Sequence, residues 1–226
     1  MSTLTTPPLA ALLTRLFADA ELTTAKLREE SKTLSPAERA ARMQQSDYRE
    51  LYTRMKDFHL PVSPETGRFL YMLARASRVR SIIEFGTSFG ISTLHLAAAL
   101  RDNGGGHLIT TEFEPSKIAR ARDNIAAAGL SDLVEIREGD ALQTLARDLP
   151  ESIDLVLLDG AKSLYARVLA LLEGRLRTGS LILADNADWC PEYLAYVRAS
   201  TNGYLSVPFA EDVELSMRLE PTAARR

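Results

Sequence analysis

The sequence predicts an α/β protein in which helices cover both faces of a mostly parallel sheet. Two observations support this prediction. Short apolar runs alternate with segments of helical period from residue 63 onwards, and the last two apolar runs are separated by only a short connection. Strands that alternate with helices form parallel sheets, whereas strands joined by a short connection pair antiparallel. We therefore expect a seven-stranded, mostly parallel sheet with a C-terminal antiparallel hairpin.

The expected elements follow from the spacing of apolar residues. Five strands that should be parallel are predicted at Ser81–Phe85, His107–Thr111, Leu133–Arg137, Ile153–Leu158 and Ser180–Ala184. The predicted hairpin consists of Tyr204–Val207 and Val213–Leu219. Helical period is found at Ile91–Leu100, Pro115–Ala128 and Tyr165–Leu172. Another helix should begin at Ser63-Pro64, because serine caps helices and proline suits their first position.

The first sixty residues predict helices only. One apolar helical face is formed by Leu9, Leu12, Leu13, Leu16, Phe17 and Ala20. A second helix should open at Ser35-Pro36-Ala37-Glu38, which has the spacing of a capping box. We interpret residues 1–60 as an N-terminal helical extension and residues 61–226 as the α/β domain. These helices pack on a core or on a partner subunit, or they form a lid over the substrate. From the apolar face of the first helix we expect a homodimer.

Composition and charge exclude several classes of function. Of the 226 residues, 46% are hydrophobic and 25% charged, which is ordinary for a globular domain. The net charge is −3 and the basic residues are dispersed, so we expect no nucleic-acid or membrane partner. A single cysteine, Cys190, excludes an internal disulfide and fits a reducing compartment. Because Arg15 interrupts the apolar run near the N-terminus, no signal peptide is predicted, and we expect a cytoplasmic protein.

Three consecutive strands end in residues suited to bind a cofactor. In open α/β sheets the ligand lies beyond the carboxyl ends of the strands. The first strand runs into Glu84-Phe85-Gly86-Thr87-Ser88-Phe89-Gly90, where Gly86 and Gly90 allow the backbone to approach a ligand closely. Glu112 ends the second strand and could accept both hydroxyls of a ribose. Asp140 follows the third strand and could meet an adenine amino group.

A nicotinamide oxidoreductase is disfavoured by the glycine spacing. Its pyrophosphate-binding turn has the pattern G-x-G-x-x-G, whereas this chain has serine at position 88 and the pattern G-x-x-x-G. Glycine in a strand-to-helix turn is also common for backbone reasons alone. The cofactor interpretation therefore depends on Glu112 and Asp140 occurring at the next two strand ends.

The next two strands end in oxygen ligands and a lysine. Asp159 follows the fourth strand, and Asp185 and Asn186 follow the fifth. Two carboxylates and a carboxamide suit Mg²⁺, Ca²⁺ or Mn²⁺ better than zinc. Lys162 lies three residues beyond Asp159 and could serve as a general base. Each of these residues alone is more often a turn residue or a solvated lysine, so their co-occurrence carries the hypothesis.

Here the chain resembles a known family. From about Leu60 to Leu219 it is similar to the catechol and caffeoyl-CoA O-methyltransferase group, which are class I S-adenosylmethionine-dependent enzymes with a Rossmann-like fold. The shared features are the E-x-G-x-x-x-G turn at Glu84–Gly90, the D-x-x-K-x-x-Y motif at Asp159, Lys162 and Tyr165, and the D-N-x-x-W motif at Asp185, Asn186 and Trp189.

The resemblance implies a reaction and a set of site residues. It implies metal-assisted transfer of a methyl group from S-adenosylmethionine to a hydroxyl of a small catechol-like or vicinal-hydroxyl acceptor. Asp159, Asp185 and Asn186 would bind Mg²⁺ or another divalent cation, and Lys162 would be the catalytic base. The residues that would line the cofactor are Glu84, Gly86, Ser88, Gly90, Ser92, Glu112, Asp140 and Asp159.

The sequence also departs from that family. Gly160-Ala161 is smaller than the pair often found between the motif's Asp and Lys, which indicates a roomier or less polar pocket floor. Ala210-Glu211-Asp212 replaces a G-D-G turn before the last strand, with Glu211 at the acid position. Two alternatives therefore stay open. One is a metal-independent N- or O-methyltransferase, and the other is a non-catalytic scaffold with the same fold.

Overall fold

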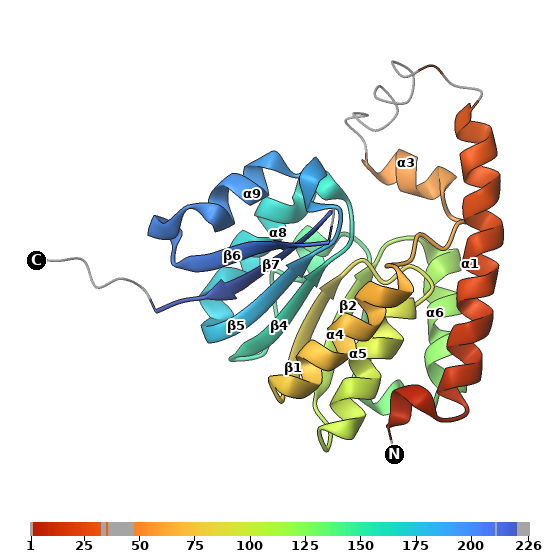
Figure 1. Cartoon of the computed structure of the whole chain (residues 1–226), viewed down its shortest axis with the longest axis horizontal. Coiled ribbons are helices and arrows are strands. Elements are labelled where there is room, and N and C mark those ends of the chain that lie inside the picture. Colours follow the sequence, from red (N-terminus) through yellow and green to blue (C-terminus); the bar gives the residue numbers. More distant parts are fainter. Residues whose placement is uncertain (1, 33–34, 36–47, 211, 221–226) are drawn as a thin grey trace, which may run out of the picture.

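The computed structural model describes residues 2–32, 35, 48–210 and 212–220 (Figure 1). Its strands are β1 (Ser81–Phe85), β2 (His107–Glu112), β3 (Val134–Glu138), β4 (Ile153–Leu158), β5 (Leu176–Ala184), β6 (Tyr204–Phe209) and β7 (Val213–Arg218). They form one seven-stranded sheet in the order β3-β2-β1-β4-β5-β7-β6. The first five strands pair in parallel, and β7 runs antiparallel to both β5 and β6. The predicted sheet and its C-terminal hairpin are therefore confirmed.

Helices precede the sheet and connect its strands. They are α1 (Leu9–Lys32), α3 (Tyr48–Arg54), α4 (Pro64–Ala76), α5 (Ile91–Asp102), α6 (Pro115–Ala127), α7 (Ala141–Thr144), α8 (Tyr165–Leu172) and α9 (Pro191–Arg198). The helix α4 begins as its sequence predicts, because the Ser63 side chain accepts a hydrogen bond from the Thr66 amide and Pro64 occupies the first turn. Of the helix predicted from Pro36 onwards, residues 36–47 lie outside the described residues, and the later turns correspond to α3.

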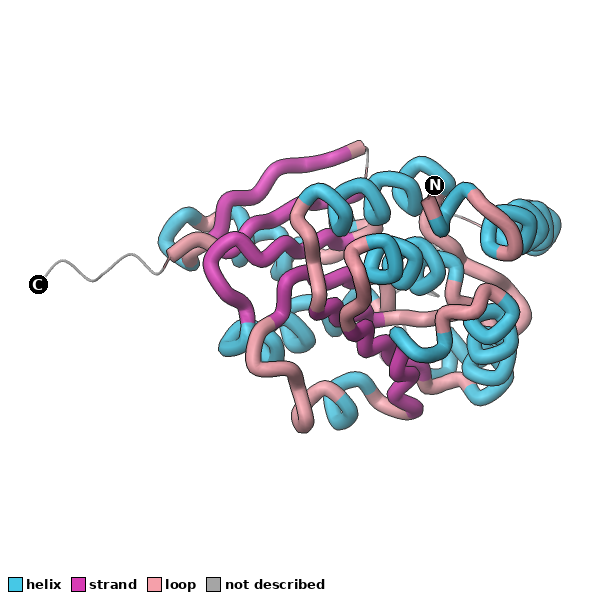
Figure 2. Tube along the Cα trace, turned by 90° about the horizontal axis from the view of Figure 1, so that it is seen from below, coloured by secondary structure: helices cyan, strands magenta, loops and turns pink. Residues whose placement is uncertain are grey.

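The sheet separates two apolar cores. Alternate residues of a strand point to opposite faces, so Ile82 of β1 faces one core and Ile83 faces the other. Apolar residues of α1, α4, α5 and α6 fill the first core, whereas α7, α8 and α9 cover the second. Figure 2 shows the strands lying between these two helical layers. Both faces being covered explains why the central strands read as continuous apolar runs.

The apolar face of α1 belongs to the chain's own core. Leu9, Leu12, Leu13, Leu16 and Ala20 are each at most 7% exposed, and the four leucines pack in the first core cluster. This face therefore needs no partner subunit to leave water. The homodimer expected from this face stays a prediction. The face no longer supports it, because it is buried within the same chain.

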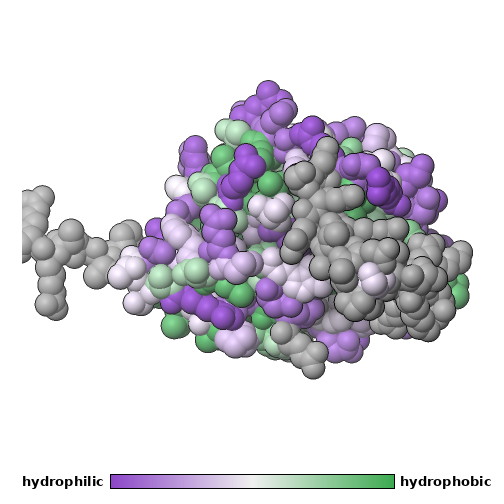
Figure 3. Space-filling view, turned by 90° about the horizontal axis from the view of Figure 1, so that it is seen from above, coloured by the Kyte–Doolittle hydropathy of each residue, from purple (hydrophilic) through white to green (hydrophobic). Residues whose placement is uncertain are grey.

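The surface of the molecule is mixed in character. Over the visible part of the face in Figure 3, polar and apolar residues are interspersed. Among the described helices, none combines the length and the apolar content that crossing a membrane requires.

The burial of α1 can be tested with two leucines of the same helix. Leu16 is 4% exposed, whereas Leu22 is 66% exposed. We expect Leu16→Ala to lower the free energy of unfolding by about 2–5 kcal/mol, because it leaves a cavity in the core. The matched Leu22→Ala should change it by less than about 0.5 kcal/mol. Urea unfolding measures both, and equal effects would show that α1 does not pack on the sheet domain.

Candidate active site

A cavity of about 430 Å³ opens at the carboxyl ends of the central strands. Because β2, β1, β4 and β5 are neighbours, the loops that follow them meet at one edge of the sheet. The segment before α4 closes the cavity with Thr24, Tyr48, Leu51, Tyr52, Met55 and Leu60. The site residues predicted from the sequence that line this cavity are Gly86, Ser88, Glu112, Asp140, Asp159, Lys162, Asp185 and Asn186.

The turn after β1 depends on glycine where it meets the end of β4. Gly86 has a φ of +105°, and a Cβ there would lie 2.3 Å from the carbonyl oxygen of Asp159. The Asp159 amide also donates a 2.8 Å hydrogen bond to the Phe85 carbonyl oxygen. Gly90 has a φ of +86° and caps α5, but it is not among the described residues that line the cavity. Backbone contact therefore places the turn directly against Asp159.

Glu84 supports the turn from beneath. It is completely buried, and its two carboxyl oxygens accept hydrogen bonds from Ser92 Oγ (2.6 Å) and Thr93 Oγ1 (2.5 Å) of α5. Burial raises the pKa of Glu84 to about 7. In the described structure Glu84 lines neither the main cavity nor the small hollow beside it. Ser92 does line that hollow, together with Gly86, Ser88 and Asp159.

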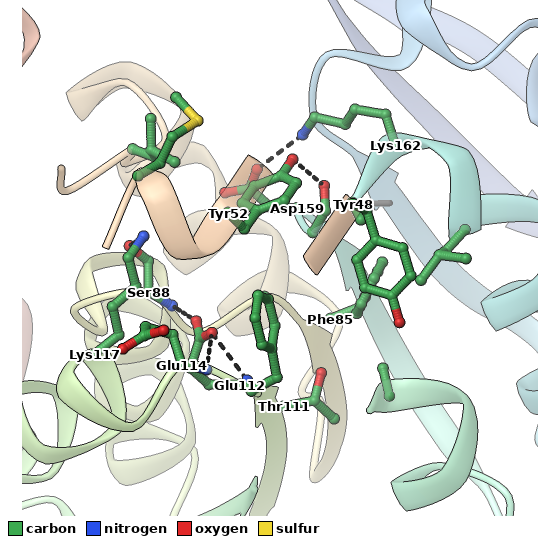
Figure 4. A pocket seen from close by; sticks show the side chains of 18 of the residues that line it. Tyr48, Tyr52, Phe85, Ser88, Thr111, Glu112, Glu114, Lys117, Asp159 and Lys162 are labelled. Carbon is green, nitrogen blue, oxygen red and sulfur yellow. Dashed lines mark hydrogen bonds and ion pairs between the residues drawn. The ribbon is translucent and has the colours of Figure 1, made fainter. Parts of the chain in front are cut away.

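Glu112 is held as an oriented hydrogen-bond acceptor. One carboxyl oxygen accepts from the amides of Phe113 (2.9 Å) and Glu114 (3.0 Å), and the other accepts from the Ser88 amide (2.9 Å). Burial raises the pKa of Glu112, while these amides and Lys117 act in the opposite direction. Figure 4 shows Glu112 and Lys117 on one side of the pocket and Asp159 and Lys162 on the other.

Asp140 joins the third strand's end to the N-terminal segment. One of its oxygens caps α7 by accepting from the Leu142 amide at 3.0 Å. The other accepts a 2.6 Å charged hydrogen bond from Nη2 of Arg49, in α3. Beside this pair, the ring of Tyr48 meets the ring of Phe113 edge-on, with 6.4 Å between their centroids. The helix α3 thus forms a wall above the end of the cavity that Asp140 lines.

Asp159 and Asp185 form a close acidic pair. Burial raises the pKa of both carboxyl groups. The charge of Asp159 raises the pKa of Asp185 further. Two buried carboxylates this close need a proton or a cation between them. Within the described residues, Lys162 is the cation that contacts the pair, with its Nζ 3.2 Å from Asp159 Oδ1.

Lys162 is fixed by two further hydrogen bonds. Its Nζ donates to the Tyr165 hydroxyl at 2.8 Å and to the carbonyl oxygen of Asp185 at 3.2 Å. The Tyr165 hydroxyl in turn donates to the same carbonyl oxygen at 2.8 Å. Tyr165 is completely buried, and burial raises its pKa well above the ordinary value. The tyrosine of the D-x-x-K-x-x-Y motif therefore holds the lysine in place.

Asn186 is oriented by an acid that sequence reasoning missed. It has a φ of +49°, in the left-handed region, and its Nδ2 donates to Asp212 Oδ2 at 2.9 Å. Because Asp212 takes the amide N–H, the Asn186 Oδ1 is left as an acceptor for another group. Glu211, expected at the acid position of this turn, lies outside the described residues, but its neighbour Asp212 reaches the site.

The donor set of Asp159, Asp185 and Asn186 fits a hard divalent cation. It offers carboxylate and amide oxygens and a surplus of negative charge. Among the described residues, no group of three His, Cys, Asp or Glu side chains is placed to hold a metal ion. The site would therefore depend on the amide oxygen of Asn186 as its third protein ligand.

The sequence indicates a roomier or less polar pocket floor at Gly160; the floor is not roomier, but the Phe85 ring makes it apolar. A Cβ at Gly160 would lie 2.6–2.8 Å from three ring atoms of Phe85, so this ring already occupies the space. From the opposite wall, the Tyr52 hydroxyl donates to the Gly160 carbonyl oxygen at 3.3 Å. Residue 160 has no side chain because an aromatic ring from the neighbouring strand β1 packs against its backbone.

Other residues of the cavity were also absent from the sequence prediction. Tyr48 and Tyr52 come from the N-terminal segment, whose helices the sequence offered as possible walls of the site without singling out these residues. Lys117 offered a signal: with Ala121, Ile125 and Ala128 it follows a helical period that is otherwise apolar. A lysine on the buried face of a helix indicates a functional or structural role for its charge.

The contact between Gly160 and Phe85 can be tested by a double-mutant cycle. We expect Gly160→Ala to lower the free energy of unfolding by about 1–3 kcal/mol, because the new methyl group overlaps the ring. Gly174→Ala is the control, since no atom lies within 4 Å of a Cβ at that position. Combining Gly160→Ala with Phe85→Leu should recover part of the loss. Strictly additive effects in denaturant unfolding would contradict the contact.

Comparison with known proteins agrees with this geometry. A family model described as O-methyltransferase matches residues 36–221. A catechol O-methyltransferase of Niastella koreensis is 38% identical over 130 residues, which cover 56% of this chain and 58% of that protein. Catechol O-methyltransferase B of Danio rerio is 35% identical over 171 residues, covering 72% and 64%. The chain thus matches less than two thirds of the length of either relative.

A solved structure supports the same assignment. The O-methyltransferase TomG of Streptomyces achromogenes, determined in complex with SAM, superposes with a TM-score of 0.64 and 26% identity. The superposition covers 74% of this chain and 85% of that protein. Together with the family match over most of the sequence, it confirms the resemblance inferred from the motifs. The chain belongs to the O-methyltransferase family and has its Rossmann-like fold.

Proposed function

We propose that the chain is an S-adenosylmethionine-dependent O-methyltransferase that acts on a hydroxyl of a small catechol-like acceptor with the help of a divalent cation. One observation carries the proposal. A single cavity has an oriented carboxylate, Glu112, at one end and the cluster of Asp159, Asp185 and Lys162 at the other. The names of the relatives and the SAM complex of TomG support the reaction and the cofactor.

The cofactor is assigned to the end of the cavity near Glu112. A carboxylate with its position fixed by three amides can accept both hydroxyls of a ribose. Asp140 would receive the adenine amino group, with Phe113 and Tyr48 beside the ring. The amino-acid end would extend toward Gly86 and the small hollow at the start of α5. Bound there, the cofactor supplies an electrophilic methyl group on a sulfonium.

The cation is assigned to Asp159, Asp185 and Asn186. A bound Mg²⁺, or another divalent ion, would act as a Lewis acid toward the acceptor hydroxyl. The two carboxylates balance its charge, and Asp212 keeps the Asn186 oxygen available by binding the amide N–H. These residues therefore fix the acceptor's place in the cavity.

We assign Lys162 the role of general base for the acceptor hydroxyl. As a neutral amine, its Nζ would take the proton of the acceptor hydroxyl while the new O–CH₃ bond forms and the S–CH₃ bond breaks. The sulfonium becomes a neutral thioether, so charge is conserved. Tyr165 and the Asp185 carbonyl keep Nζ in place during the transfer. Tyr52 of α3 and Met55, which follows it, would exclude water from the reacting atoms.

A metal-independent methyltransferase is the second candidate. The ion pair between Lys162 and Asp159 favours it, because the lysine already neutralises one carboxylate of the pair without a metal. Homodimer formation and a cytoplasmic location stay predictions from the sequence.

Cofactor binding is tested by titrating S-adenosylhomocysteine, the product cofactor, into the protein in a calorimeter. We expect Glu112→Ala to weaken binding about ten- to a hundredfold, because both ribose hydroxyls lose their acceptor. Glu138→Ala is the matched control, since Glu138 is the partner of Glu112 on β3 but does not line the cavity. Unchanged affinity in the Glu112 variant would overturn the ribose assignment.

Metal dependence is tested by methyl transfer to catechol in EDTA and again after Mg²⁺ is restored. We expect Asp185→Ala to abolish Mg²⁺-stimulated turnover while S-adenosylhomocysteine binding changes little, because one ligand and one charge are lost. Lys162→Ala should still bind Mg²⁺ but lower the rate about a hundredfold or more. Full turnover in EDTA would refute the metal site and leave the metal-independent methyltransferase.

A further inference from the structure

Lys117 is a buried lysine in the cavity wall that the proposed methyl transfer does not use. It lies in the first turn of α6 and is 3% exposed. Its Nζ donates a 3.3 Å hydrogen bond to Ser88 Oγ and stands 5.5 Å from the centroid of the Phe89 ring. Among the described residues, no carboxylate forms a direct ion pair with it. An ammonium can donate three hydrogen bonds, so most of its capacity remains available.

The cost of burying this charge is offset by acids around the cavity. Burial lowers the pKa of Lys117, whereas the negative charges nearby act in the opposite direction. Glu112 has the largest such effect, followed by Asp159, Glu114 and Asp57. The main electrostatic partner of Lys117 is therefore the carboxylate assigned to the ribose.

Ser88 connects the two side chains. Its amide donates to Glu112 Oε2 at 2.9 Å, and its hydroxyl accepts from Lys117. The Ser88 hydroxyl also donates to the carbonyl oxygen of His59, which fixes its orientation. One turn residue thus holds the ammonium at a set place on the Glu112 side of the cavity (Figure 4).

We propose that Lys117 is the positioning residue of the cofactor site: its charge keeps Glu112 ionised, so that this carboxylate accepts the ribose hydroxyls at neutral pH. The inference rests on the proposed cofactor site. Lys117 acts through Glu112 and does not contact the amino-acid end of the cofactor.

The charges around Glu112 explain why one cation matters there. The acids that act on Lys117 besides Glu112 are Glu114, which caps α6, Asp159 after β4 and Asp57 after α3. Tyr52 of α3 is a neutral phenol at ordinary pH, and burial lowers the pKa of the nearby His59. Burial favours the protonated form of Glu112, whereas Lys117 and the three amides oppose it, so removing Lys117 shifts the balance toward protonation. The pKa of Glu112 would rise, and the affinity for a ribose that needs a carboxylate would be lost at a higher pH.

The test compares Lys117→Met with Lys117→Arg over a range of pH. Methionine keeps the length of the side chain and removes its charge. Arginine keeps the charge. Two ligands are titrated by calorimetry: S-adenosylhomocysteine and 5′-methylthioadenosine, which has the ribose and adenine but no amino-acid carboxylate. Arg122→Met, an exposed charge on the same helix, is the control.

We expect Lys117→Met to move the acidic loss of binding up by about one pH unit, and to weaken both ligands by the same factor, which grows toward about tenfold as the pH falls below the pKa of Glu112. Lys117→Arg should restore the wild-type profile, and Arg122→Met should leave it unchanged. A loss confined to S-adenosylhomocysteine would overturn the inference, because Lys117 would then contact the carboxylate directly. A loss without a shifted pH profile would also overturn it. Failure of the wild-type chain to bind either ligand would instead refute the proposed function.

Discussion

The close contact between the turn after β1 and the end of β4 is the constraint on which the site depends. Gly86 lies so near the Asp159 carbonyl that no side chain fits, and the Phe85 carbonyl binds the Asp159 amide. Because of this contact, the turn that presents Ser88 to Glu112 and the strand that presents Asp159 form one rigid unit. The two ends of the cavity are thereby held at a fixed separation, which any transfer between two bound molecules requires.

The electrostatics of the cavity follow from the same crowding. Carboxyl groups from several strand ends converge at one edge of the sheet, and burial opposes their ionisation. A different basic side chain lies near each of three of these acids. Arg49 pairs with Asp140, Lys162 pairs with Asp159, and Lys117 lies on the Glu112 side. Each acid therefore has its own electrostatic environment, although all of them line a single cavity.

Much of this arrangement could be predicted from the sequence, because it depends on local patterns. Strand ends in a parallel sheet lie at one edge, so an acid after each strand was sufficient to place Glu112, Asp159 and Asp185 together. Glu84 shows the limit of such reasoning. It fits the cofactor motif, yet it is buried beneath the turn, because two hydroxyls of α5 draw it inward.

The remaining features depend on contacts between distant segments. The packing of Phe85 against Gly160 and the reach of α3 across the cavity join residues far apart in the chain, for which no periodicity exists. The apolar face of α1 shows a second limit of prediction from the sequence. Amphipathic spacing shows that a helix buries one side, but not whether its own chain or another one covers that side.

The short helix α3 connects the two ends of the cavity. Its Tyr48 lies against Phe113 at one end, and its Tyr52 reaches Gly160 at the other. Both tyrosines belong to one stretch of seven residues, so a movement that opens one end also displaces the wall of the other. A ligand that shifted α3 at one end would therefore change the shape of the other end as well.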